Sequence, residues 1–274
     1  MDWIAPALSS GLGNRLFQYA AAAGLAEKTG RPLVFFVRRC KESPHGPLAS
    51  IFRMFPRIDL IDSEEKFTEL VEPPREYYKY LPLEAALGPT VVHGFRQSPK
   101  YFPKGISLEP DWDSALGGPL VRRLLEKEAG LAMLEQRQRT ISVHIRMGDY
   151  LILPHHHVEL GKYLMNALEK IPAGSRIHFF SDEPEKCGLY VRSYAVSKGL
   201  DFTIAPVRSD VESLYEMSLC QGGNITCNST FSWWGAWFAH QAGSPWATYP
   251  SSFGRGMPAP QDLFPEWGII IPVV

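Results

Sequence analysis

Three side chains that could act on an anion stand close together near the middle of the chain: His144, Arg146 and Asp149. They follow the alternating apolar run of residues 141–145, which predicts a buried strand. Gly148 lets the backbone turn there. Ligands of open α/β sheets bind at the carboxyl ends of strands, and an arginine presents a fixed fork of donors to paired anionic oxygens. The stretch therefore predicts a site for a phosphate-bearing ligand.

Two further groups of polar residues stand where a strand is expected to end. Residues 177–180 predict a strand followed by Ser181-Asp182, and Asp182 either accepts hydrogen bonds from a ribose or guanine edge or caps the next helix. Residues 228–230 stand where a strand becomes a helix, which is the geometry that binds phosphate. The alternative is an N-capped helix buried by its aromatic residues, and the tryptophans that follow are expected to pack in the core.

A glycine-containing segment near the amino terminus, Gly11-Leu12-Gly13-Asn14, lies between a strand expected over residues 3–8 and a helix expected over 16–28. Two glycines there let a phosphate approach backbone N–H groups. A dinucleotide-binding fingerprint would need its third glycine at position 16, which is Leu16. A glycine turn without a ligand stays open as the alternative.

Composition limits the class of protein. The chain has 274 residues, of which 45% are apolar, so it can bury a large core. Its net charge of −1 gives no global field that attracts nucleic acid. The four cysteines form no Cys-x-x-Cys pair, so we expect free thiols in a reducing compartment. The sequence shows no signal peptide and no apolar run of the roughly 20 residues that span a bilayer, so a cytoplasmic location is expected.

The order of elements predicts an α/β protein. The start reads as strand, loop, helix and strand, and residues 120–138 predict a charged amphipathic helix broken at Gly130. After residue 140, strands alternate with helices, which predicts a parallel sheet with right-handed crossovers. We therefore expect two Rossmann-like lobes, 1–138 and 139–274, with the last residues packing back on the first lobe.

Five segments, in order along the chain, resemble those of the inverting α-1,2-fucosyltransferases: residues 11–20, 93–102, 144–150, 180–182 and 218–237. This resemblance implies a GT-B type fold, with two Rossmann-like lobes facing a central cleft for donor and acceptor. It implies GDP-fucose as the donor, a glycan hydroxyl as the acceptor, with the O2 of a galactoside expected, and no metal or other cofactor.

The resemblance also implies roles for individual residues. Arg146 corresponds to the arginine that binds the donor diphosphate, and His144 belongs near the guanosine. Asp149 is the first candidate for the base that removes the acceptor proton. The remaining expected donor contacts are Gly11, Gly13, Asn14, Asp182, Asn228, Ser229, Thr230 and Phe231.

Two positions depart from the family pattern. Met147 stands where the family has a second arginine; because neighbouring strand residues point to opposite faces, we expect this methionine to pack in the core and one arginine to suffice. Arg15 stands where the family commonly has glutamine, and we expect it to add positive charge near the phosphates. The alternatives to fucosyl transfer are a transferase for another nucleotide sugar and a non-catalytic module that binds a glycan or nucleotide.

Overall fold

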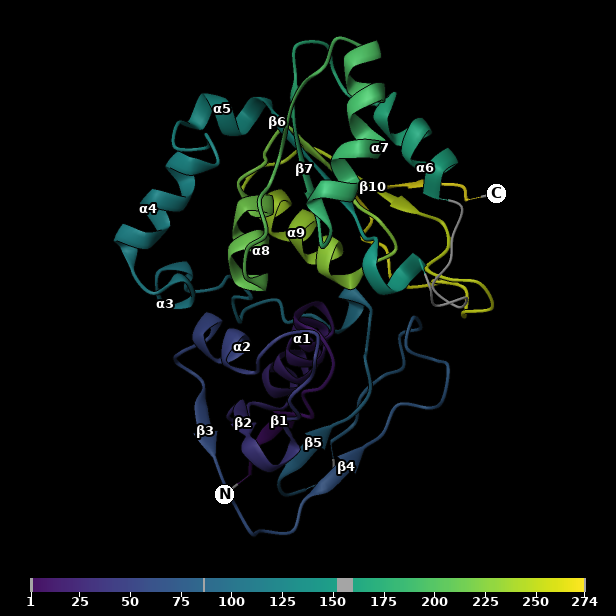
Figure 1. The fold of residues 1–274 in the computed structure, drawn as a ribbon. Helices are drawn as coiled ribbons and strands as arrows, with labels where there is room; N and C mark the ends of the chain where they lie inside the picture. The colour runs from purple at the N-terminus through teal and green to yellow at the C-terminus, as the bar shows by residue number, and fades with distance from the viewer. Residues whose placement is uncertain (1, 86, 152–159, 274) are drawn as a thin grey trace. The chain divides into compact units, whose positions relative to one another are not determined.

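The computed structural model describes residues 2–85, 87–151 and 160–273, and the chain forms two compact units (Figure 1). Unit 1 holds the chain through Ala115 together with Pro258–Pro265, and unit 2 holds Leu116–Met257 and the residues from Glu266 onward. The sequence predicts a boundary after residue 138, whereas this division falls after Ala115. The reason is that residues 119–139 pack within unit 2, where Glu126 accepts a hydrogen bond from the Tyr215 hydroxyl.

Unit 1 is built from short parallel strands around one long helix. β1 pairs with β5, which pairs with β4, and β2 pairs with β3. An isolated parallel bridge between Ile4 and Leu33 joins β1 to the chain just before β2. The elements are β1 (Ile4–Pro6), α1 (Leu12–Thr29), β2 (Val34–Phe36), η1 (Val37–Arg39), α2 (Ala49–Met54), β3 (Asp59–Ile61), β4 (Thr68–Leu70), β5 (Thr90–Val92) and η2 (Pro99–Tyr101).

Unit 2 is a six-stranded parallel sheet in the order β11-β10-β9-β6-β7-β8. Following the chain, the strands run outward from β6 to β8 and then from β9 to β11, which is the doubly wound Rossmann order. The strands are β6 (Thr140–Ile145), β7 (Arg176–Ser181), β8 (Asp201–Ile204), β9 (Gly223–Ile225), β10 (Ala247–Pro250) and β11 (Gly268–Ile271). The helices are α4 (Pro119–Glu128), α5 (Leu134–Arg139), η3 (Gly148–Leu151), α6 (Leu160–Leu168), α7 (Pro184–Ser197), α8 (Asp210–Ser218) and α9 (Thr230–Gln241). The short helix α3 (Trp112–Leu116) begins in unit 1 and ends at the first residue of unit 2.

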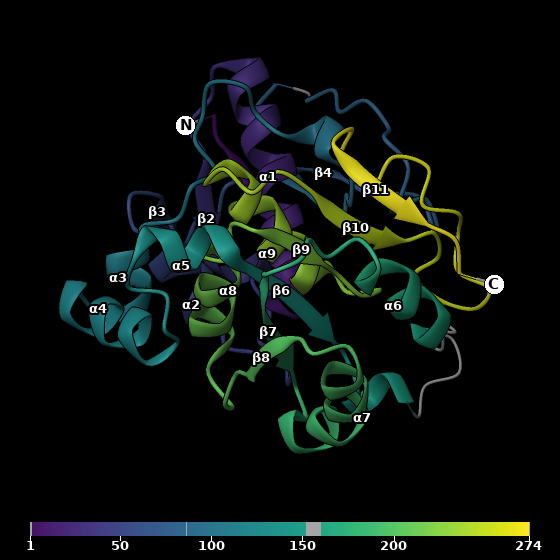
Figure 2. The same ribbon diagram turned by 90° about the horizontal axis from the view of Figure 1, so that it is seen from above.

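Helices cover both faces of this sheet, with α6 and α7 on one side and α8 and α9 on the other (Figure 2). The alternation of β6 explains why. Ile141 and Val143 are fully buried in a cluster that includes Tyr163 of α6 and Val191 of α7. The residues that alternate with them, Ser142 and His144, point to the opposite face. The parallel α/β architecture expected from the sequence is therefore confirmed.

Several local expectations are also resolved. The broken helix over residues 120–138 is confirmed as α4 and α5, separated at Gly130, whose positive φ of 68° suits glycine. All four cysteines are free, as expected.

Across the residues described, no helix combines the length and apolar character needed to span a membrane.

Candidate active site

The candidate site in unit 2 lies where the strand order of the sheet reverses. β6 and β9 are neighbours, and from them the chain winds outward in opposite directions. In sheets of this kind the helices leave the carboxyl ends of the two central strands on opposite faces, which opens a crevice for ligands. His144, near the end of β6, places its Nδ1 3.1 Å from Sγ of Cys227, which follows β9. His144 and the segment after β9 therefore meet at this switch point.

Arg146 is held in place by a carboxylate from the adjacent strand. β6 and β7 pair in register, with Ile145 opposite Ser181, so the residues that follow the two strands meet at one edge. Arg146 Nε lies 3.4 Å from Asp182 Oδ2, and the other carboxylate oxygen, Oδ1, accepts a hydrogen bond of 2.8 Å from the backbone N–H of Met147. The Arg146 and Asp182 side chains are 29% and 22% exposed, so the ion pair can be reached from solvent.

The structure tests whether Asp182 caps the helix that follows it, the alternative to ligand binding. α7 begins at Pro184 with Glu183 as its N-cap and no side-chain cap, so the capping interpretation is wrong. Gly148 is required beside this carboxylate, because a Cβ at that position would stand 2.4 Å from Asp182 Oδ2. Asp182 thus orients the Arg146 guanidinium and the turn after β6; its predicted contact with the nucleoside stays a prediction.

His144 is a neutral group. Burial, together with the positive charge of Arg146, lowers the pKa of its imidazole to about 3. Its neighbour Cys227 is also uncharged, because burial raises the pKa of that thiol to about 11. An imidazole with so low a pKa is a poor base at neutral pH. His144 can therefore donate or accept hydrogen bonds and pack against the Phe231 ring, whose centroid is 5.9 Å away.

This buried imidazole predicts a pH dependence of stability. Since the folded pKa of His144 lies below the usual 6.5, the unfolded state binds the additional proton, and stability present above pH 6.5 is lost as the pH falls toward 3. Between pH 6.5 and about 5 the loss amounts to about 2 kcal/mol. His144→Gln should flatten this dependence in urea unfolding at about pH 7 and pH 5. The exposed His45 provides the control His45→Gln; equal slopes for both variants and the unmodified protein would contradict the assignment.

Residues 228–231 form the start of α9. Ser229 is the N-cap, and its Oγ accepts a hydrogen bond of 3.3 Å from the Phe231 N–H. The Asn228 side chain is buried and donates to the Phe253 carbonyl at 3.0 Å. The N-cap interpretation made from the sequence is confirmed, and the phosphate contacts predicted for this helix N-terminus stay a prediction. Trp233 and Trp234 of the same helix are fully buried, as expected.

The glycine-containing segment belongs to unit 1, and there the sequence-based boundary of the helix is wrong. α1 begins at Leu12, with Gly11 as an extended N-cap that makes no side-chain cap, so Gly13 and Asn14 lie in its first turn. The first backbone N–H groups of α1 have no intrahelical acceptor, which is the property for which the segment was singled out. Asn14 donates to Ser10 Oγ at 2.9 Å and accepts from Gln97 Nε2 at 2.7 Å. The donor contacts predicted for these residues stay predictions.

Arg15 has a different place from the one expected. Its side chain is fully buried, and its guanidinium donates to the carbonyls of Gly46 at 2.9 Å and Lys41 at 3.3 Å. It therefore ties down the segment after β2 instead of extending from the start of α1. A lone arginine in a helix gives no sequence signal for such a long-range contact.

The predicted base falls partly outside the described structure. Asp149 lies in η3, but its side chain is outside the described residues, so its role stays a prediction. Sequence reasoning missed two contacts, Cys227 with His144 and Asp182 with the Met147 N–H. The contact of Asp182 with the Met147 N–H follows from the register of β6 with β7, which places Ser181 beside Ile145.

Comparison with known proteins finds glycosyltransferases that are similar to this chain. Residues 120–253 match the sequence model of glycosyl transferase family 11. A stretch of 112 residues, 37% of this chain, is 32% identical to the O-antigen biosynthesis glycosyltransferase WbnK of Escherichia coli, and it spans 35% of that relative's length. Among solved structures, fucosyltransferase NodZ from Bradyrhizobium gives a TM-score of 0.45 at 15% identity, covering 85% of this chain and 91% of NodZ. POFUT1 in complex with GDP gives 0.49 at 12% identity, covering 90% of this chain and 97% of POFUT1.

The family match runs from α4 to the segment after β10 and so includes the whole switch point of unit 2. Residues 120–253, just under half of the chain, are similar to glycosyl transferase family 11, and this similarity supports the resemblance found in the motifs.

Proposed function

We propose that this protein transfers L-fucose from GDP-fucose to a glycan hydroxyl, the O2 of a galactoside, with inversion at the anomeric carbon. The observation that carries the proposal is the Arg146 guanidinium, held by Asp182 at the switch point of the unit 2 sheet. A fixed guanidinium beside the N-terminus of α9 suits a diphosphate, and the family match supports glycosyl transfer as the reaction.

The proposed chemistry is stabilisation of a leaving group. As the bond between the fucose C1 and the β-phosphate oxygen breaks, its electron pair passes to that oxygen, and negative charge grows on GDP. Preorganised donors aimed at this charge are usually the largest catalytic term. Arg146 supplies a full positive charge, and the first backbone N–H groups of α9 supply partial ones. The neutral His144 would contact the nucleoside without competing for the phosphates.

The acceptor hydroxyl oxygen attacks C1 from the face opposite to GDP, which forms the new C–O bond and inverts the centre. Its proton must leave during or after this step. We assign it to the Asp149 carboxylate, which follows Arg146 by three residues in the turn after β6.

Titration calorimetry with GDP, UDP and dTDP tests the choice of donor. GDP is expected to bind most tightly, and Arg146→Ala should weaken it. Tighter binding of UDP or dTDP would favour a transferase for another nucleotide sugar.

We expect transfer to persist in EDTA, because the guanidinium and helix N-terminus provide the charge stabilisation that a metal would otherwise supply.

Incubation with GDP-fucose and a panel of galactosides, followed by linkage analysis, tests the reaction. Fucose on O2 would support both the proposed donor and the proposed linkage. Fucose on another oxygen would support GDP-fucose as the donor and contradict the linkage. Tight binding of GDP with no transfer or hydrolysis would favour the non-catalytic module.

A further inference from the structure

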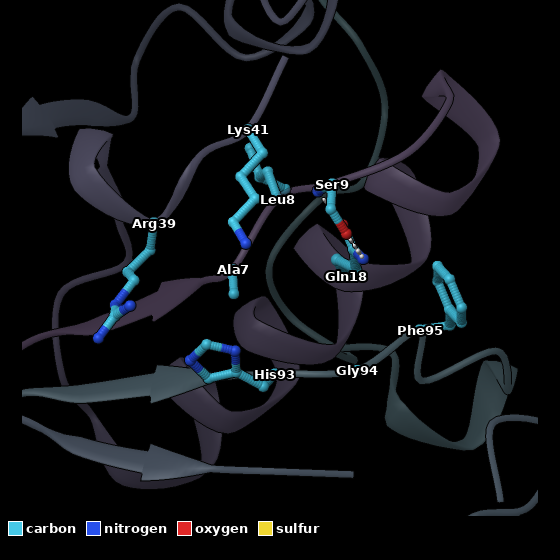
Figure 3. Close-up of a pocket in the computed structure, with 9 residues that line it drawn as sticks. All are labelled: Ala7, Leu8, Ser9, Gln18, Arg39, Lys41, His93, Gly94 and Phe95. Atoms are coloured by element: carbon cyan, nitrogen blue, oxygen red, sulfur yellow. Dashed lines mark hydrogen bonds between the residues drawn. The ribbon is translucent and has the colours of Figure 1, made fainter. Parts of the chain in front are cut away.

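Unit 1 contains a pocket of about 170 Å³ that no part of the proposed donor site uses (Figure 3). It lies at the carboxyl ends of three neighbouring strands. Its walls come from residues 7–9 after β1, Arg39 and Lys41 after β2, and residues 93–95 after β5. Carboxyl ends of parallel strands are the usual ligand-binding edge of an α/β sheet.

The size of the pocket limits what it can hold. Pockets for drug-sized ligands measure roughly 300–1,000 Å³, so this one fits a single sugar unit rather than a nucleotide. Ala7, Leu8 and the Phe95 ring give it apolar walls suited to the C–H faces of a sugar. Ser9 and Gln18 also line it, but they bond to each other through Gln18 Nε2 and Ser9 Oγ at 3.1 Å.

The charge of the pocket is positive. Arg39 pairs with Glu69 at 2.6 Å, and His93 Nε2 lies 3.5 Å from the same carboxylate. Burial lowers the pKa of His93 below 6.5, so this ring is neutral at pH 7. Among the described ion pairs none involves Lys41, whose positive charge nevertheless acts on His93. A second carboxylate, that of Glu72, accepts a hydrogen bond from the Phe95 N–H at 2.8 Å and pairs with Arg96 at 3.9 Å. Each of these two acids faces an arginine, so Lys41 supplies the positive charge that is left over beside the pocket.

The position of Lys41 is fixed by its backbone. Its N–H donates to the Leu8 carbonyl at 2.8 Å, and its own carbonyl accepts from the buried Arg15 at 3.3 Å. These two bonds tie the residue to both β1 and α1. The Lys41 and His93 side chains then reach toward Ala7 from opposite sides of the pocket (Figure 3). The anchored backbone fixes the point from which the flexible lysine side chain extends into the pocket.

We infer that this pocket binds an acidic sugar unit of the acceptor, one that carries a carboxylate or a phosphate, and that Lys41 binds its anionic group. This inference rests on the proposed function, because the bound sugar is an acceptor only if the protein transfers fucose. Arg39 sets the electrostatic potential, while the apolar walls and Phe95 hold the ring. The protein thereby selects acidic glycans over neutral ones.

Calorimetry on the full chain without donor tests the inference. The probes are methyl galacturonoside, galactose 6-phosphate, neutral methyl galactoside and inorganic phosphate. The two acidic sugars should bind roughly fivefold or more tightly than the neutral one, with the difference shrinking in high salt. Lys41→Met should remove the preference, Lys41→Arg should keep it, and Lys66→Met, at an exposed lysine of unit 1 outside the pocket, should leave it unchanged.

Equal affinity for acidic and neutral sugars, or equal preferences in Lys41→Met and the unmodified protein, would overturn the inference. If inorganic phosphate binds as tightly as galactose 6-phosphate, the sugar ring contributes nothing to binding and the assignment of a sugar site is wrong. Since no donor is present, a protein that binds acidic sugars but transfers no fucose would refute the proposed function and still support the pocket.

Discussion

Replacing Arg146 by alanine is expected to reduce fucose transfer at least roughly a hundredfold while the protein stays folded. The side chain is partly exposed, and it carries the positive charge at the end of β6. Its loss removes stabilisation of the charge that grows on GDP. The rate of transfer should therefore fall, whereas the affinity for the acceptor should change little. Initial rates with GDP-fucose, together with circular dichroism and unfolding midpoints, measure both consequences.

Arg146→Lys separates charge from geometry. A lysine keeps the charge but loses the planar guanidinium, whose Nε lies 3.4 Å from Asp182 Oδ2 and whose fork suits two oxygens of a phosphate. We expect it to recover only part of the lost rate. Arg192, exposed on α7 of the same unit, supplies the matched control Arg192→Ala, which should transfer fucose normally. Near-normal turnover in Arg146→Ala would remove this residue from the mechanism.

The sequence predicted best where local pattern and burial agree. The strand over residues 141–145 alternates branched apolar residues with polar ones, and it appears as β6 at the centre of the sheet. The strands β7 to β10 and the helices α6 to α9 also lie within a few residues of the positions predicted from the apolar pattern. The topology also brings the carboxyl ends of β6, β7 and β9 to one edge, and with them the predicted site residues that follow these three strands.

Other features could not be predicted because their causes are not local. β3, β4 and β11 are short and partly exposed, so they carry little apolar periodicity. The start of α1 at Leu12 depends on Gly11 as an N-cap without a side chain, which gives no capping signal. The tether between Arg15 and the carbonyl of Gly46 spans 31 positions in sequence. Contacts of this kind become visible only once the chain is folded.

The departure at Met147 gives the second large expected effect. Its side chain is 5% exposed and belongs to the cluster between β6 and helices α6 and α7, as expected for the residue next to Arg146. Met147→Arg, which creates the pair of arginines usual in the family, should therefore destabilise the protein by at least about 2 kcal/mol, because it forces a charge into an apolar core. Met147→Leu, which nearly conserves volume, should cost less than about 1.5 kcal/mol.

Denaturant unfolding midpoints and fucose transfer rates of the two variants together distinguish a packing role of residue 147 from contact with the donor. If Met147 serves the core, Met147→Arg loses stability and gains no activity, while Met147→Leu keeps both. Full stability together with faster transfer in Met147→Arg would mean that the side chain at this position reaches the donor. The backbone N–H of residue 147 bonds Asp182 whichever side chain is present, so the grip on Arg146 should survive both substitutions in any variant that folds. A change in activity can then be traced to the side chain at position 147 rather than to the loss of Arg146.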